Sequence, residues 1–197
     1  MSTELQIVIL QAHKVPFSKI TVRLQKTVNF AAQKLNKKIN FTIHGDQIEF
    51  ERTILSHLIR PIEMMLKNAI VYGIEETEVR QKRGKPLTAK LLLDITQTTS
   101  EVMIKLSDDG DELDVATLRK KAEELELINP HTVISDQAMM QLVLNPSLKI
   151  ERCREMDKIN HDIECLGGLL FVHSTLNEGV TFEIQFRQAF SYLTSFA

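Results

Sequence analysis

The stretch MMLKNAIVYGIE at residues 64–75, followed by SDDG at residues 107–110, decides the fold predicted for this chain. The first stretch ends a series of apolar residues spaced three and four apart, which predicts a long helix with one buried face over residues 54–71. The second stretch follows two alternating runs, residues 90–96 and 102–106, that predict a β-hairpin. The chain therefore places an asparagine late in a buried helix and an acidic turn at the end of a hairpin.

The rest of the chain, on both sides of these two stretches, also predicts helices and strands. Further helices are predicted at residues 17–35, 115–127, 136–144 and 152–166, and further strands at residues 39–43, 169–174 and 180–186. Asp114 and Ser135 would cap two of these helices, and the charged segment around Gly84-Lys85-Pro86 is predicted as a linker. Strands separated by helices, with two hairpins, predict an α/β fold: a two-layer sandwich of one mixed β-sheet and helices packed on one face.

Composition limits the classes of protein to consider. A chain of 197 residues with 43% hydrophobic content predicts one globular domain. The net charge is −2 and the basic residues are dispersed, which argues against nucleic-acid binding. Apolar runs are shorter than the roughly 18 residues that a membrane span needs, and Glu4 lies where a secretory signal carries positive charge. We expect a cytoplasmic protein without membrane insertion.

The motifs resemble a known family once they are taken together. Residues 64–75 are followed by Glu78-Val79-Arg80 and then by Gly84-Lys85-Pro86. This run resembles the ATP-binding catalytic domain of CheA-type chemotaxis histidine kinases, which belong to the GHKL class, and is most similar to the kinases that regulate type IV pili (ChpA-like). The resemblance extends over residues 15–186 and implies the histidine-kinase ATPase, or Bergerat, fold.

The resemblance implies a site for ATP and Mg²⁺. The Asn68 amide oxygen would ligate the magnesium ion, as a hard ligand for a hard cation. Asp108 would accept a hydrogen bond from the adenine amine, and Gly110 would let the base approach the backbone. By itself a helical asparagine is ordinarily solvated, and Asp-Asp-Gly is a common turn sequence. The surrounding run is what gives Asn68, Asp108 and Gly110 their expected roles.

Several positions depart from the family pattern near Asn68. Met64 and Tyr72, at i−4 and i+4 and hence on the same face of the helix, stand where relatives carry histidines. A thioether cannot relay a proton, and a phenol with a pKa near 10 is a poor substitute. Glu63 lies about 100° around the helix, so we do not expect it to replace the missing base. No catalytic residue is therefore assigned.

The segments that should hold the nucleotide also depart from the pattern. Asp111-Glu112 follows Gly110 where a second glycine is expected, and added carboxylates repel a triphosphate. The phosphate-binding lid should be rich in glycine, but residues 145–157 contain none. Val180 lacks the hydroxyl that relatives direct toward adenine, and Thr181 should face the other side of the strand.

Three functional hypotheses follow. The first is a degenerate CheA-like kinase domain that binds ATP weakly, with partners among histidine phosphotransfer domains, response regulators and chemotaxis coupling proteins. The second is a nucleotide-free pseudokinase scaffold that acts as a protein-interaction module. The third, an active ATPase, would need Arg152 or Arg154 to replace the lid. The expected boundaries are a remnant of a preceding helical dimerisation segment at residues 1–14, an ATPase domain at 15–188 and a tail at 189–197.

Overall fold

A five-stranded mixed sheet forms one layer of the molecule. The computed structural model describes residues 14–148, 150, 155–175 and 178–187. The strand order is β2-β4-β5-β7-β6, where β2 pairs with β4 in parallel and the other neighbours pair antiparallel. The strands are β2 (Lys38–His44), β4 (Thr88–Gln97), β5 (Glu101–Asp108), β6 (Gly168–Thr175) and β7 (Gly179–Arg187). Both predicted hairpins are confirmed.

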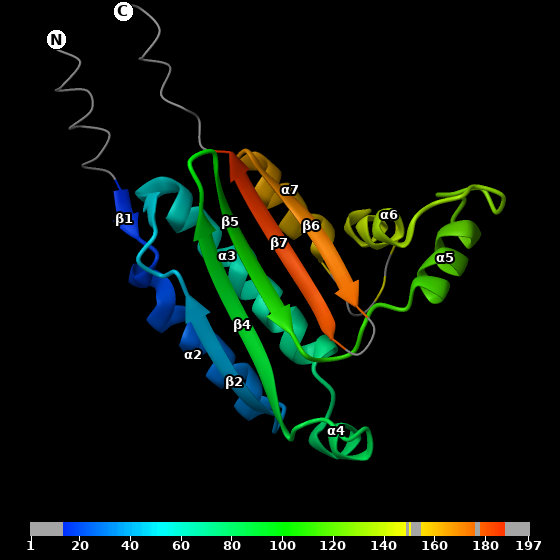
Figure 1. Ribbon diagram of the computed structural model, residues 1–197, viewed down its shortest axis with the longest axis horizontal. Helices are drawn as coiled ribbons and strands as arrows, with labels where there is room; N and C mark the ends of the chain where they lie inside the picture. Colours follow the sequence, from blue (N-terminus) through cyan, green and yellow to red (C-terminus); the bar gives the residue numbers. More distant parts are fainter. Residues whose placement is uncertain (1–13, 149, 151–154, 176–177, 188–197) are drawn as a thin grey trace, which may run out of the picture.

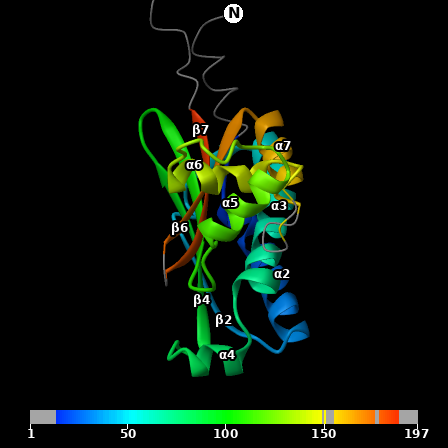
Figure 2. The same ribbon diagram turned by 90° about the vertical axis from the view of Figure 1, so that its right-hand side faces the viewer.

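Helices cover one face of this sheet, as Figures 1 and 2 show from two directions. Next to the sheet lie α2 (Ser18–Lys34), α3 (Arg52–Asn68) and α7 (Met156–Cys165), while α5 (Val115–Glu124) and α6 (Asp136–Gln141) lie beside the β6 edge. A 3₁₀ turn, Leu142–Leu144, follows α6. The predicted α/β two-layer sandwich is confirmed.

Apolar periodicity explains why these elements pack as they do. In α2 the buried residues are spaced three or four apart, as one helical stripe requires, and they are Ile20, Leu24, Val28 and Ala31. In β5 every second residue is buried, which directs one side of the strand toward the helices. The two layers share one hydrophobic core.

Helix caps follow the sequence closely. Asp114 accepts a hydrogen bond from the Ala116 N–H, and Ser135 accepts one from the Ala138 N–H, as both were predicted to do. The predicted helix at residues 152–166 begins later, because Glu155 has a φ of +65° and α7 starts at Met156. A left-handed residue interrupts the helical hydrogen-bond series.

Three short elements were not predicted. The strands β1 (Lys14–Pro16) and β3 (Glu49–Glu51) form a separate antiparallel pair. The predicted linker instead contains α4 (Thr77–Lys82). Residues 1–13 and 188–197 lie outside the described residues, so the predicted dimerisation remnant and tail stay predictions, although Lys14 belongs to β1. Among the described helices, none is long and apolar enough to cross a bilayer.

Candidate functional site

Asn68 is the last residue of α3, and its surroundings differ from those expected. The α-helix changes at Asn68 into a π-helical turn, Ala69–Gly73, in which Ile74 donates its N–H to the Ala69 carbonyl at 2.7 Å. The α-helical i, i+4 spacing therefore does not extend to Tyr72, contrary to the sequence prediction. Such turns are rare and frequently occur at functional sites.

A buried lysine stabilises this turn. The Lys37 ammonium donates to the carbonyls of Ile70 at 3.0 Å and Ile74 at 2.8 Å, and it lies 3.4 Å from the carboxylate of Glu76. Only 8% of Lys37 is exposed. A cation at the carboxyl end of a helix satisfies its terminal carbonyls and complements its dipole, so Lys37 fixes the segment that follows Asn68.

The start of α7 packs onto Asn68. Its amide Nδ2 lies 3.4 Å from the sulfur of Met156, the first residue of α7. Asn68 is 9% exposed and Met156 is fully buried. The predicted metal ligand therefore sits beneath the helix that follows the lid segment.

Asp108 ends β5 on the other side of the site. It is 5% exposed, and its Oδ1 accepts a hydrogen bond from the Gly110 N–H at 3.0 Å. Asp108 is paired with Leu91 of β4 and Val180 of β7. The sheet therefore fixes Asp108 itself, and the turn begins immediately after it.

Gly110 joins the two stretches that the sequence singled out. The Asp111 N–H donates to the Gly73 carbonyl at 2.9 Å, and a Cβ atom on Gly110 would lie 2.2 Å from the Gly73 oxygen. This contact explains the glycine without a ligand, because any larger residue would collide with the π-helical turn. The predicted contact between Gly110 and a nucleotide stays a prediction.

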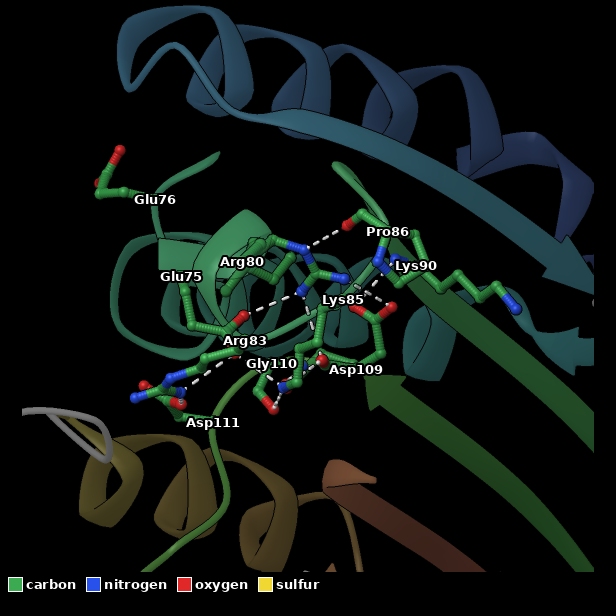
Figure 3. A network of polar contacts seen from close by, with 12 residues as sticks. Glu75, Glu76, Arg80, Arg83, Lys85, Pro86, Lys90, Asp109, Gly110 and Asp111 are labelled. Carbon is green, nitrogen blue, oxygen red and sulfur yellow. Dashed lines mark hydrogen bonds and ion pairs between the residues drawn. The ribbon is translucent and has the colours of Figure 1, made fainter. Parts of the chain in front are cut away.

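A buried charge network surrounds this junction (Figure 3). The Arg80 guanidinium is 1% exposed and donates to Glu75 at 2.8 Å, to the Asp109 carboxylate at 2.9 Å and to the Pro86 carbonyl at 2.7 Å. The Lys85 ammonium pairs with the other Glu75 oxygen at 2.7 Å. Two cations thus balance two anions, as burial of charge requires.

The network also holds the backbone of the acidic turn. Lys85 donates to the carbonyl oxygens of Asp109 at 3.0 Å and Gly110 at 2.8 Å, and Asp109 Oδ1 accepts the N–H of Lys90 at 3.0 Å. Arg83 joins the network through Glu75 at 3.3 Å and also pairs with Asp111, so one of the two carboxylates expected to repel a triphosphate is neutralised by an arginine.

Burial and charge act in opposite directions on Glu75. Desolvation raises the pKa of its carboxyl, but the hydrogen bond from Lys85 and the charges of Lys85 and Arg80 outweigh it and lower the pKa below its ordinary value. Glu75 is therefore ionised at neutral pH. Sequence reasoning placed Glu75, Arg80 and Lys85 within a family-like run but missed the network. The opposite charges of these residues could have predicted it, but part of their segment was interpreted as a linker.

Two open cavities lie next to the acidic turn. The larger, of about 660 Å³, is lined by Arg83, Lys85, Asp111, Glu112 and Asp114. The smaller, of about 380 Å³, extends from Glu112 toward α6 and β6 and is lined by the side chains Glu112, Leu113, Asp114, Val115, Asp136, Met140 and Ser174. Neither lining set, drawn from the described residues, includes Asn68 or Asp108. Glu112 and Asp114 line both.

Glu63, beside Met64, and Thr181, beside Val180, have structural partners of their own. Glu63 accepts two hydrogen bonds from Arg23 of α2, at 2.8 and 2.9 Å, and one from Thr27. The hydrogen bond from Arg23 lowers the pKa of Glu63 against the opposing effect of burial, so this carboxylate is bound to α2. Val180 is buried, while Thr181 faces away and its hydroxyl lies 2.8 Å from that of Ser107. The expected alternation on β7 is confirmed.

The lid segment is described only in part. Leu148 is 3% exposed and packs into the core, and Glu155 has the left-handed conformation at the start of α7. A glycine adopts this conformation without strain, but here it is imposed on a residue with a side chain. Residues 149 and 151–154 lie outside the described residues, so the predictions for Arg152 and Arg154 stay untested.

The sequence of this chain is similar to those of chemotaxis proteins. The chain is 30% identical over 192 residues to the chemotaxis protein CheA of Halobacterium salinarum, covering 92% of this chain and 29% of that protein. It is 28% identical over 193 residues to CheA of Treponema pallidum, covering 94% of this chain and 24% of that protein. The chain is homologous to a domain-length part of CheA-type proteins. A scan against protein-family models finds no match.

Solved structures show the fold independently. The histidine kinase domain of the blue-light activated histidine kinase from Erythrobacter litoralis EL346 superposes with a TM-score of 0.50 at 11% identity, covering 87% of this chain and 64% of that one. A second structure of that kinase has a TM-score of 0.51 at 13% identity, covering 87% of this chain and 41% of the other. The chain therefore has the histidine-kinase ATPase fold, and it spans less than a third of the length of these two CheA proteins.

Proposed function

We propose that the chain is the ATP-binding domain of a CheA-like histidine kinase that acts in chemotaxis or type IV pilus signalling, with weak or absent phosphotransfer. The contact between Gly73 and Gly110 carries this proposal. It brings the end of α3, with Asn68, to the turn that follows Asp108. Asn68 lies shortly before this contact in one segment and Asp108 shortly before it in the other, which supports one shared site.

The side-chain oxygens of Asn68 and Asp108 are of the chemical type that Mg²⁺ and adenine require. An amide oxygen on Asn68 is a hard ligand suited to Mg²⁺, and the carboxylate of Asp108 can accept a hydrogen bond from an exocyclic amine. Bound Mg²⁺ would neutralise charge on the phosphates. The same residues are less than a tenth exposed, so the nucleotide would have to compete with Met156 and with the Asp108–Gly110 hydrogen bond.

Weak or absent phosphotransfer follows from the residues next to Asn68. Met64 cannot transfer a proton, and Glu63 is held by Arg23 and has its pKa lowered, which makes it a weaker base at neutral pH. Glu155 places a side chain where a glycine-rich lid would present backbone N–H groups to phosphate. The chain would therefore retain recognition of the base and metal better than catalysis.

The alternative is a nucleotide-free scaffold. The burial of Asn68 under Met156 favours it, because an amide oxygen on a residue that is only 9% exposed is poorly accessible to a metal ion. Its partners would be a histidine phosphotransfer domain, a response regulator or a coupling protein of a chemotaxis pathway, by analogy with CheA-type proteins.

Calorimetry with Mg-ATP decides between the two functions. We expect saturable binding that is lost in Asn68→Ala and Asp108→Asn and retained in Asn40→Ala, a matched change at an exposed asparagine of β2. Each variant must first show cooperative unfolding. If the folded parent chain binds no Mg-ATP at millimolar concentration, ATP binding is excluded and the scaffold function is favoured.

A further inference from the structure

The turn after Asp108 depends on contacts outside the sheet. The pairing of β5 with β4 and β7 extends to Asp108 and no further. Beyond it, Asp109 exchanges two hydrogen bonds with the Lys90 backbone, from its N–H to the carbonyl at 3.2 Å and to its Oδ1 from the N–H at 3.0 Å, and other contacts of the turn run to Gly73, Arg80, Arg83 and Lys85. The side chains around Arg80 therefore determine where the acidic turn lies relative to the end of α3.

Arg80 contacts three separate segments at once. Its Nη1 donates to Glu75, which follows the π-helical turn; its Nη2 donates to Asp109, which follows β5; and its Nε donates to Pro86, just before β4. A planar guanidinium has donors in fixed directions that suit this arrangement, whereas a lysine presents one nitrogen. A lysine at this position would offer its three donors from one nitrogen, which does not match the separate directions from which these acceptors approach.

We propose that Arg80 is a positioning residue that holds the Asp108–Gly110 turn at a fixed place relative to Asn68. One consequence of this proposal rests on the proposed function: Mg-ATP binding would depend on Arg80, a residue that cannot touch the nucleotide. At 1% exposure the guanidinium is inaccessible to a ligand. Arg80 would act on the site only indirectly, by binding Glu75, which follows α3 and the π-helical turn, and Asp109, which follows β5.

The test measures hydrogen exchange in the ligand-free full chain and Mg-ATP affinity in the same variants. In Arg80→Lys, we expect exchange of the Gly110 and Asp111 amides to accelerate about tenfold or more, with the amides of the β4–β5–β7 ladder unchanged. Mg-ATP affinity should fall about tenfold as well. The control is Arg23→Lys, which makes the same substitution at an arginine that donates two hydrogen bonds to Glu63, and it should change neither quantity.

Two results would overturn the proposal. Equal acceleration at all amides would mean that Arg80 stabilises the whole fold, and unchanged exchange at Gly110 and Asp111 would mean that the turn does not depend on it. If Arg80→Lys fails to fold, Asp109→Asn provides the same comparison with a smaller change. If the parent chain binds no Mg-ATP, the proposed function fails by itself, and exchange still decides whether Arg80 fixes the turn.

Discussion

The sulfur of Met156 lies 3.4 Å from Nδ2 of Asn68, so the first residue of α7 contacts the last residue of α3. These residues are 88 positions apart in sequence. Because Met156 is fully buried, the contact fixes the start of α7 over the end of α3. Any rearrangement that frees Asn68 must therefore move the segment that follows the lid.

Replacing Met156 tests how this contact is stabilised. Met156→Ala leaves a cavity at a fully buried site and should lower the free energy of unfolding by about 2–5 kcal/mol. Met156→Leu keeps the volume and should lower it by less than about 1.5 kcal/mol. Urea unfolding measures both. An equal loss in the two variants would show that the sulfur, and not the filled volume, stabilises the junction.

Gly110→Ala should separate the two stretches of the site. The added Cβ would lie 2.2 Å from the Gly73 oxygen and 2.8 Å from Asp108 Oδ1, so the backbone must shift, with a loss of stability of about 1–3 kcal/mol or more. The Gly73 amide resonance should move in NMR spectra. Gly84→Ala is the control, because its Cβ would meet open space and only the positive φ is strained. An unmoved Gly73 resonance in Gly110→Ala would contradict the close approach.

The sequence predicted the sheet and its helices because apolar periodicity determines which faces are buried. Residues of α2 and the alternation in β5 carry that signal directly. It also assigned Asn68 and Asp108 to one nucleotide site through the family-like run, and that assignment stays a prediction. The π-helical turn and the Arg80 network were missed, because both depend on tertiary contacts. Lys37 reaches the turn from another element, and Arg80 is buried against the nearby Glu75 together with the distant Asp109.

Glu75→Gln should change the dependence of stability on pH. The pKa of Glu75 is lowered in the folded chain, so its stabilisation is complete well above the ordinary carboxyl value of about 4.3 and is lost as pH falls through the lower folded value. At pH 7 the variant should lose about 3–5 kcal/mol, because Arg80 and Lys85 keep a buried excess of positive charge. Below about pH 4 the difference between parent and variant should shrink.

The matched control for Glu75 is Glu49→Gln, at an exposed strand residue. It should leave stability at pH 7 within about 0.5 kcal/mol of the parent. Glu63 and Glu183, whose pKa values are also lowered, remain in both proteins, so the difference curve isolates Glu75. A difference between parent and Glu75→Gln that stays constant from pH 7 to pH 3 would mean that Glu75 acts through packing and not through its charge.

Lys37→Met should destabilise the π-helical turn through loss of a buried donor. The ammonium is bonded to the carbonyls of Ile70 and Ile74, and methionine fills similar volume without donating, so we expect a loss of about 2–3 kcal/mol in urea unfolding. The adjacent Lys38 is exposed, and Lys38→Met should cost less than about 0.5 kcal/mol. Since the turn positions Gly73 against Gly110, the Asp111 amide should exchange faster in Lys37→Met alone. Equal effects of the two substitutions would show that the carbonyls at the end of α3 do not require the lysine.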